Sequence, residues 1–244
     1  MNGWNPDDGP GLDSVIEQLQ TCDLTVDGRL PWSSNLTFLV TLQTDGPQDI
    51  KAVYKPAQGE QSLWDFPGGL YRREVAAFAL SEALGWGIVP PTVERGEGPF
   101  GPGSLQLFVE ADYQQHYFTL FDEGLHEAAL RRMCVFDLVA NNADRKSGHV
   151  LLGSDSRLWA IDHGLCFHWQ PKLRTVIWDF ADEVVPRDIL VDLDRLASDL
   201  PDTLDQLLSD SEREALLARV TRVLDTAVFP APTGDRPPYP WPLV

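Results

Sequence analysis

Two stretches of the chain carry polar side chains that could do chemistry at the ends of apolar segments. In NNADRKSGHVLL, residues 141–152, four such side chains follow one another: Asp144, Arg145, Lys146 and His149. Shortly afterwards, the apolar run LWAI ends at Asp162, where the following His-Gly pair permits a sharp turn. Carboxylates at two neighbouring loop ends are suited to bind a metal ion that carries a polyphosphate.

A lysine and a glutamate further upstream complete this candidate site. Lys55 stands at the end of the apolar segment KAVYKP, and Glu74 is the acid nearest to the apolar face of the next predicted helix. An ammonium held by a carboxylate is suited to contact phosphate oxygens. Taken singly, each residue has a plainer interpretation: an exposed strand-end lysine, a solvated helix start, and ordinary loop or turn positions for Asp144 and Asp162. The combination favours the functional interpretation.

The elements that must position these residues form a strand-rich first half. A helix is expected at 12–22, capped by Asp13 or Ser14. Alternating or clustered β-branched and aromatic residues then predict five short strands, at 23–30, 35–43, 50–56, 87–96 and 103–110. A long helix at 70–85 follows the third strand, and Gly85 ends it. This pattern predicts a small α+β lobe with an antiparallel sheet and one inserted helix.

Helices dominate the second half of the chain. They are expected at 126–140, 187–200 and 211–228, with Ser211 and Glu214 forming a capping box for the last one. A short strand pair, 149–152 and 158–162, flanks the aspartates. The proline-rich tail is either a strap over the surface or a disordered end.

The composition limits the class of partner. The chain has 244 residues, a net charge of -18 and 43% hydrophobic residues, so it can bury a core but repels nucleic acids and anionic lipid headgroups. Three cysteines without paired spacing indicate reduced thiols, and no apolar run reaches membrane-spanning length. We therefore expect a cytoplasmic protein without nucleic-acid partners or integral membrane association.

The order of these motifs resembles a known family. REVAAFALSEALGWGIVPPT, NNADR and AIDHGLCF are similar to the helix with its following strand, the catalytic loop and the metal-binding turn of the phosphatidylinositol 3/4-kinase-like branch of the protein-kinase fold. The resemblance covers roughly residues 24–182 and is strongest for small actinobacterial members. It implies a two-lobed protein-kinase-like fold of the α+β class, with a small antiparallel-sheet N-lobe carrying one helix and a mainly helical C-lobe. The expected divisions are 1–23 for the lead-in and helix, 24–110 for the N-lobe, 111–229 for the C-lobe and 230–244 for the tail.

The resemblance also implies a role for each site residue. Lys55 would contact the α- and β-phosphates of ATP, and Glu74 would position Lys55. Asp144 would orient or deprotonate the acceptor hydroxyl, and Asp162 would hold the metal. Two neighbours would assist: Arg145 by bracing the loop and Lys146 by neutralising the transferring phosphoryl group. The interlobe hinge that offers backbone groups to adenine would comprise Phe108, Val109 and Glu110.

Two departures from the family pattern leave alternatives open. In place of a glycine-rich phosphate loop the chain has GRLPWSSN, where three residues could offer donors to phosphate or form an ordinary polar hairpin: Ser33, Ser34 and Asn35. In place of the family's second metal-binding asparagine stands His149, a poor ligand for Mg²⁺ but acceptable to Mn²⁺. Either His149 binds Mn²⁺, or it contacts phosphate while Asn142 or water completes the shell, or the second metal site is lost.

The expected activity is therefore transfer of the γ-phosphoryl group of ATP, with Mg²⁺ or Mn²⁺, to a hydroxyl of a small molecule or a protein. A nucleotide-binding or scaffolding pseudokinase is the main alternative. Nucleotidyl transfer by the same fold is a third possibility, if ATP binds in the reverse direction.

Overall fold

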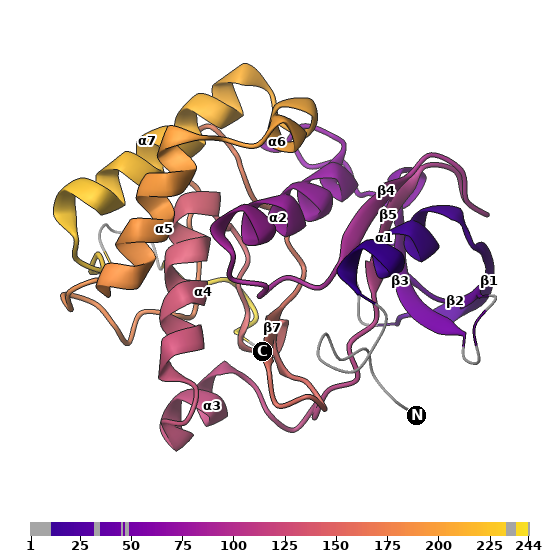
Figure 1. Ribbon diagram of the computed structural model, residues 1–244, viewed down its shortest axis with the longest axis horizontal. Helices are drawn as coiled ribbons and strands as arrows, with labels where there is room; N and C mark the ends of the chain where they lie inside the picture. Colours follow the sequence, from indigo (N-terminus) through magenta and orange to yellow (C-terminus); the bar gives the residue numbers. More distant parts are fainter. Residues whose placement is uncertain (1–10, 32–34, 45, 47–48, 233–237, 244) are drawn as a thin grey trace.

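The computed structural model describes residues 11–31, 35–44, 46, 49–232 and 238–243. Within these ranges the chain forms one strand-rich lobe and one helical lobe, which lie side by side in Figure 1. The strand-rich lobe contains α1 (Leu12–Thr21), β1 (Asp23–Arg29), β2 (Phe38–Gln43), β3 (Ile50–Pro56), α2 (Leu70–Leu84), β4 (Thr92–Arg95) and β5 (Gly103–Leu107). The α+β expectation, with five strands and an inserted helix, is confirmed.

The sheet has the order β1-β2-β3-β5-β4, and all neighbouring strands are antiparallel. In β3, Ala52 and Tyr54 are buried on the face where α1 packs with Val15 and Leu19. Because side chains alternate along a strand, Lys55 lies on the opposite face. A side chain at Gly103 would collide with the backbone of Lys55, so the glycine lets β5 approach the end of β3 closely.

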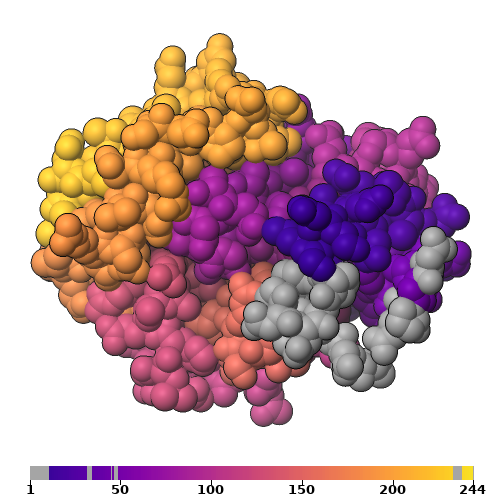
Figure 2. Space-filling model, in the orientation of Figure 1, coloured from indigo at the N-terminus to yellow at the C-terminus, as the bar shows by residue number. Residues whose placement is uncertain are grey.

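Helix α2 lies between the sheet and the helices that follow it. Its ends are set by Gly69 and Gly85, both in the left-handed region with φ of 84° and 71°. Strands β4 and β5 contact α2 in one lobe, and α5 and α6 contact it in the other. This double contact explains why residues on several sides of α2 are buried, Glu74 among them. Figure 1 shows α2 between the sheet and the later helices, and in Figure 2 its purple atoms lie between the orange atoms of the later helices and the indigo atoms of α1.

The helical lobe contains α3 (Tyr117–Glu123), α4 (Glu127–Ala140), α5 (Arg187–Ser198), α6 (Asp202–Leu207) and α7 (Asp210–Thr226), with the hairpin of β6 (Val150–Leu152) and β7 (Leu158–Ala160). The sequence pattern did not single out α3 or α6. The expected capping box at Ser211 and Glu214 was wrong by two residues, because the box consists of Ser209 and Glu212. Glu212 also pairs with the buried Arg73 of α2, which fixes that position.

The described part of the proline-rich tail lies on the helical lobe. Leu243 packs against the core of that lobe, and its carbonyl accepts a hydrogen bond from the Ser147 backbone N–H at 2.8 Å. Of the two alternatives for the tail, these residues form the strap. No helix in the described ranges is both long enough and apolar enough to cross a membrane.

Candidate active site

Three of the expected site residues meet where the lobes face each other. The Lys55 Nζ atom, at the end of β3, donates to Oε1 of Glu74 on α2 and lies 2.9 Å from Oδ1 of Asp162. The Glu74 side chain is 3% exposed, whereas that of Asp162 is 49% exposed. The pair is therefore anchored on one side by a buried carboxylate and open on the other, where a ligand can approach.

The turn that carries Asp162 is tied to the same glutamate. Oε2 of Glu74 accepts a hydrogen bond from the His163 backbone N–H at 2.9 Å, so one carboxylate holds both Lys55 and the turn. Asp162 itself has φ of 61°, in the left-handed region. The sequence placed the unusual backbone conformation at Gly164, but the glycine does not have a positive φ. Aspartate tolerates this region better than most non-glycine residues, and the positive φ sets the direction in which the carboxylate leaves the turn.

The charges at this point reinforce one another. The Lys55 ammonium lowers the pKa of Asp162 far below its ordinary value, against the opposing effect of burial. Burial would lower the pKa of Lys55, but the carboxylates of Asp162 and Glu74 outweigh it and raise that pKa. Lysine and aspartate are therefore both charged across the physiological pH range.

His149 is the second side chain that reaches the Asp162 carboxylate. Its Nε2 atom lies 3.4 Å from Oδ2 of Asp162, and its side chain is 15% exposed. Burial lowers the pKa of His149 to about 4, and the nearby cations add to this effect while Asp162 opposes it. The imidazole is therefore neutral at pH 7. Its Nδ1 atom accepts the Lys146 backbone N–H at 3.5 Å, and Nε2 is the ring nitrogen that faces Asp162. Among the described residues no group of three or more histidine, cysteine or acidic side chains forms a metal cluster.

Asp144 lies in the loop after α4, with its side chain 27% exposed. Its backbone N–H donates to Oδ1 of Asn142 at 3.0 Å, and its carboxylate lies 3.1 Å from the Lys146 ammonium. Burial raises the pKa of Asp144, the Lys146 charge opposes this, and the negative charge of Asp162 raises the pKa further. Asp144 is thus a half-buried carboxylate with elevated basicity that is close enough to respond to Asp162.

Arg145 lies inside the protein, where it braces the loop. Its side chain is 0% exposed and pairs with Asp137 of α4, which is also 0% exposed. Nη1 donates to the carbonyl of Ile161 at 2.8 Å, and Nη2 lies 2.7 Å from Nε2 of His163. The guanidinium therefore joins α4, the loop of Asp144 and the turn of Asp162. Because it is fully buried, its function is to position other residues.

Sequence reasoning missed two members of this buried network, Asp137 and His163. Asp137 also accepts from Thr175 Oγ1 at 3.0 Å and from Asn142 Nδ2 at 2.9 Å. The available signal was a lone acid inside the apolar helix RRMCVFDLVA, since a buried carboxylate requires a partner. His163 is 0% exposed, and its neutral ring accepts from the arginine, because burial lowers its pKa well below the ordinary value.

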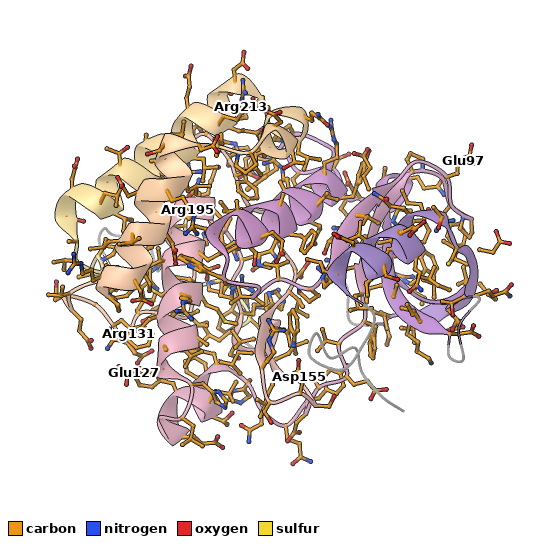
Figure 3. All side chains as sticks on the ribbon, in the orientation of Figure 1. Glu97, Glu127, Arg131, Asp155, Arg195 and Arg213 are labelled. Atoms are coloured by element: carbon orange, nitrogen blue, oxygen red, sulfur yellow. The ribbon has the colours of Figure 1, made fainter. Side chains whose placement is uncertain are left out.

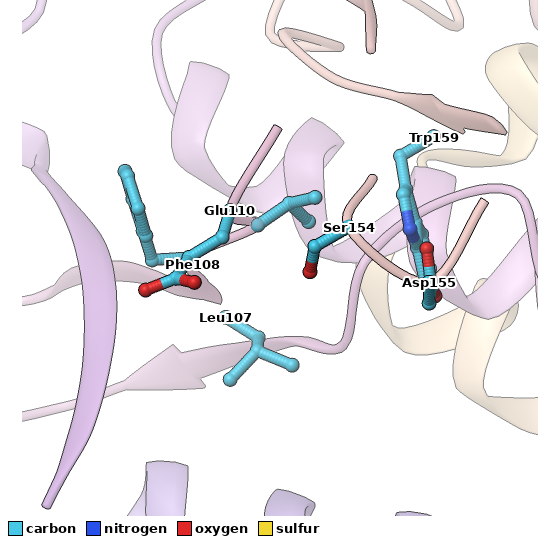
Figure 4. Close-up of a pocket in the computed structure, with 7 residues that line it drawn as sticks. Leu107, Phe108, Glu110, Ser154, Asp155 and Trp159 are labelled. Atoms are coloured by element: carbon cyan, nitrogen blue, oxygen red, sulfur yellow. The ribbon is translucent and has the colours of Figure 1, made fainter. Parts of the chain in front are cut away.

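The three expected hinge residues connect the two lobes. The Phe108 N–H donates to the Lys51 carbonyl at 2.9 Å, and the Glu110 carbonyl accepts from Ser154 N–H at 2.9 Å. Among the described residues neither backbone group of Val109 has a hydrogen-bond partner. Figure 4 shows a pocket between this segment and the β6–β7 turn, lined by Leu107, Phe108, Val109, Glu110, Ser154, Asp155 and Trp159. Its volume of about 10 Å³ is too small for a purine ring.

The remaining expected residues belong to the turn between β1 and β2. Ser33 and Ser34 lie outside the described residues. Asn35 uses its side-chain oxygen to accept the Gln61 backbone N–H at 2.9 Å, which ties this turn to the segment after β3. Because an amide oxygen only accepts, the Nδ2 group is the part of this side chain that could donate to a phosphate.

A larger cavity of about 200 Å³ lies in the helical lobe, away from these residues. It is lined by α3, α4 and the segment before α5, where Arg131 pairs with Glu127 and Glu183. Figure 3 shows Arg131 and Glu127 close together on α4. The arginine also lies over Phe180, with 4.5 Å from its Cζ to the ring centroid. This cavity contains paired charges and structural aromatics, and it shares no residue with the Lys55 site.

Comparison with solved structures confirms the two-lobed kinase-like fold. The crystal structure of the Golgi casein kinase with Mn/ADP bound aligns with a TM-score of 0.55 and 14% identity, covering 88% of this chain and 74% of that one. The structure of hydra Fam20 with sugar aligns with a TM-score of 0.52 and 17% identity, covering 88% of each chain. At this level of identity the likeness establishes the fold alone.

Comparison of sequences establishes the family. Protein Rv2133c of Mycobacterium tuberculosis is 38% identical over 260 residues, which cover 90% of this chain and 92% of the relative. The family described as phosphatidylinositol 3- and 4-kinase matches residues 90–225, which include the loop of Asp144 and the turn of Asp162. The chain therefore belongs to the phosphatidylinositol 3- and 4-kinase family.

Proposed function

We propose that the protein is an ATP-dependent phosphotransferase that moves the γ-phosphoryl group of ATP to a hydroxyl acceptor. The observation that carries this proposal is the convergence of Lys55, Glu74 and Asp162 from three elements of two lobes, beside the loop of Asp144. Phosphoryl transfer needs this kind of arrangement, because its catalysis consists mostly of positioning and charge neutralisation.

In this proposal Lys55 binds the α- and β-phosphates. Glu74 fixes the ammonium with one carboxylate oxygen and fixes the turn of Asp162 with the other. A phosphate oxygen that approaches from the exposed side of Asp162 meets a cation whose pKa is raised, so the charge needed for binding is always present. Replacing the Lys55–Asp162 contact by phosphate contacts requires no movement of the buried Glu74.

Asp162 and His149 are suited to hold a divalent cation together with phosphate oxygens. One carboxylate and a neutral imidazole provide two ligands, and this oxygen–nitrogen pair favours Mn²⁺ over Mg²⁺. A cation held by these two side chains would supply positive charge that offsets the negative charge developing on the phosphates during transfer. The left-handed backbone at Asp162 aims the carboxylate for this purpose. The Golgi casein kinase, a structural neighbour whose crystal structure has Mn and ADP bound, supports this combination.

Asp144 is the residue proposed to orient the acceptor hydroxyl and accept its proton. Burial raises the pKa of Asp144, which makes it a better base than an exposed aspartate, and the Lys146 ammonium opposes this rise and so favours the ionised form. Lys146 lies beside this carboxylate and can neutralise the transferring phosphoryl group. Arg145 holds the loop from inside the protein.

The backbone of Val109 is proposed to bind adenine, because its N–H and carbonyl have no hydrogen-bond partner among the described residues. The adjoining pocket of about 10 Å³ has to widen when the purine enters. The acceptor is a small molecule or a protein. We assign no nucleic-acid partner and no integral membrane association, since the net charge of -18 repels phosphate-rich surfaces. Free Cys22, Cys134 and Cys166 support a reducing, cytoplasmic setting.

A thermal-shift comparison tests the binding part of this proposal. ATP with Mn²⁺ or Mg²⁺ should raise the melting temperature of the wild-type protein, because a ligand that binds only the folded state stabilises it. Asp162→Asn should remove the metal-dependent part of the shift. If neither metal supports any shift by ATP, the site does not bind the nucleotide and the proposal fails.

A further inference from the structure

The described carboxy-terminal residues, Pro238–Leu243, contact the two segments that surround Asp144. The Ser147 N–H, three positions after Asp144, donates to the Leu243 carbonyl at 2.8 Å. The Thr175 N–H donates to the Pro238 carbonyl at 3.0 Å. The backbones of Thr175 and Arg145 also form an isolated parallel β-bridge. The tail thus adds an outer layer to the paired segments that carry the loop of Asp144.

Both donors are buried. Ser147 is 0% exposed and Thr175 is 1% exposed. A buried N–H that loses its acceptor is unfavourable, so without the tail both groups would be stable only where water can reach them. The backbone around Ser147 could reach water only by moving outward. Because Asp144 lies three positions earlier in the same loop, its carboxylate would move as well.

The composition of this segment suits a docking element. Residues 238–243 read PYPWPL and carry no charge. The prolines donate no backbone hydrogen bond and restrict the free chain, so the segment offers carbonyl acceptors and loses little entropy on docking. Pro240 is buried, and Leu243 packs against the core of the helical lobe. The donors on the loop and the acceptors on the tail are therefore complementary.

We propose that Pro238–Leu243 is a positioning strap, which holds the loop of Asp144 in the geometry that phosphoryl transfer requires. This inference rests on the proposed function for its effect on the reaction, but the strap itself is a property of the folded chain. Its hydrogen bonds run to Ser147 and Thr175 rather than to Lys55 or Asp162, and His149, two positions after Ser147, is also held by its own contact with the Lys146 backbone. Loss of the strap therefore impairs transfer much more than nucleotide binding.

Hydrogen exchange tests the strap without reference to activity. Leu243→Asp places a charge where Leu243 packs against the core of the helical lobe. The control, Val191→Asp, introduces the same charge at an exposed position of α5. In Leu243→Asp, peptides that cover 144–150 and 174–178 should exchange about tenfold faster or more, while β3 stays protected. The control should match the wild type. Unchanged exchange in both peptides would overturn the proposal.

Release of phosphate from Mn·ATP tests the consequence for the reaction. Leu243→Asp should lower kcat about tenfold or more, while KM for ATP changes less than about twofold. A variant that lacks 238–244 should regain turnover when the synthetic peptide PYPWPLV is added. A parallel loss of rate and nucleotide affinity would show a merely structural role and refute the strap. If the wild type releases no phosphate, the proposed function fails, and hydrogen exchange alone decides on the strap.

Discussion

The ammonium of Lys55 lies 2.9 Å from the carboxylate of Asp162, although 107 positions separate the two residues in the chain. Each comes from a different lobe. Glu74 accepts from Lys55 with one carboxylate oxygen and from the backbone N–H of His163, the residue after Asp162, with the other. This relationship makes the site a property of the interface between the lobes. Changes that separate the lobes therefore remove the site even when every site residue is present.

Replacing Asp144 should separate binding from transfer. Asp144→Asn keeps the size of the side chain but removes the base, so phosphate release should fall by about 10²–10⁴-fold. The thermal shift by Mn·ATP should remain, because Lys55 and Asp162 are untouched. An equal loss of nucleotide binding and turnover would contradict the role of Asp144 as base.

The pH dependence of turnover should follow the pKa of Asp144. A base acts when ionised, so the rate rises with pH through that pKa, which burial raises above the ordinary value of about 3.9. The Lys146 ammonium lowers the pKa of Asp144. In Lys146→Met this effect is lost, and the acidic limb of the pH–rate profile should move to higher pH. A limb that stays in place or moves to lower pH would exclude Asp144 as the titrating base.

The identity of residue 149 should set the metal preference. A neutral imidazole 3.4 Å from the Asp162 carboxylate suits Mn²⁺, whereas an amide oxygen suits Mg²⁺. His149→Asn should therefore raise the Mg·ATP thermal shift relative to the Mn·ATP shift. If the ratio of the two shifts is the same in both proteins, His149 does not contact the metal.

The buried pair of Arg145 and Asp137 should dominate the stability of the loop. Asp137→Asn leaves the buried guanidinium without its counter-charge, so the free energy of unfolding should fall by about 3–5 kcal/mol. The control is Asp188→Asn, which breaks an exposed pair with Arg132 and should cost about 1 kcal/mol or less. Urea unfolding measures both. Similar small losses would show that the buried pair does not brace the loop.

Much of the fold was predictable because its elements have strong local signals. The alternating pattern of β3 and the glycine after α2 give the ends of those elements to within a residue or two. The order of Lys55, Glu74, Asp144 and Asp162 along the chain identified the candidate site, because the motifs around them have family-like spacing. The site could be predicted although its residues are spread from position 55 to position 162 of the chain.

The interior of the site was harder to predict. Arg145 looks like an exposed loop residue in NNADRKSG, and only tertiary packing shows that it is buried against Asp137. The position of the capping box of α7 depends on the ion pair between Glu212 and Arg73. Arg73 lies far away in the sequence, so the residues around α7 alone do not predict this pair. The short helices α3 and α6 have 7 and 6 residues, and such helices form through tertiary contacts rather than propensity.

The fate of labelled ATP tests the central claim most directly. With Mn²⁺ and ATP labelled at either the γ- or the α-phosphate, the wild-type protein should release the γ-label as phosphate or transfer it, while the α-label stays in the nucleotide. Lys55→Met should lose this turnover, and Lys51→Met, which removes one positive charge from the same strand, should keep it. Transfer of the α-label would indicate a nucleotidyl transferase, and retention of both labels in ATP by the wild type would indicate a pseudokinase. Either result would contradict the account.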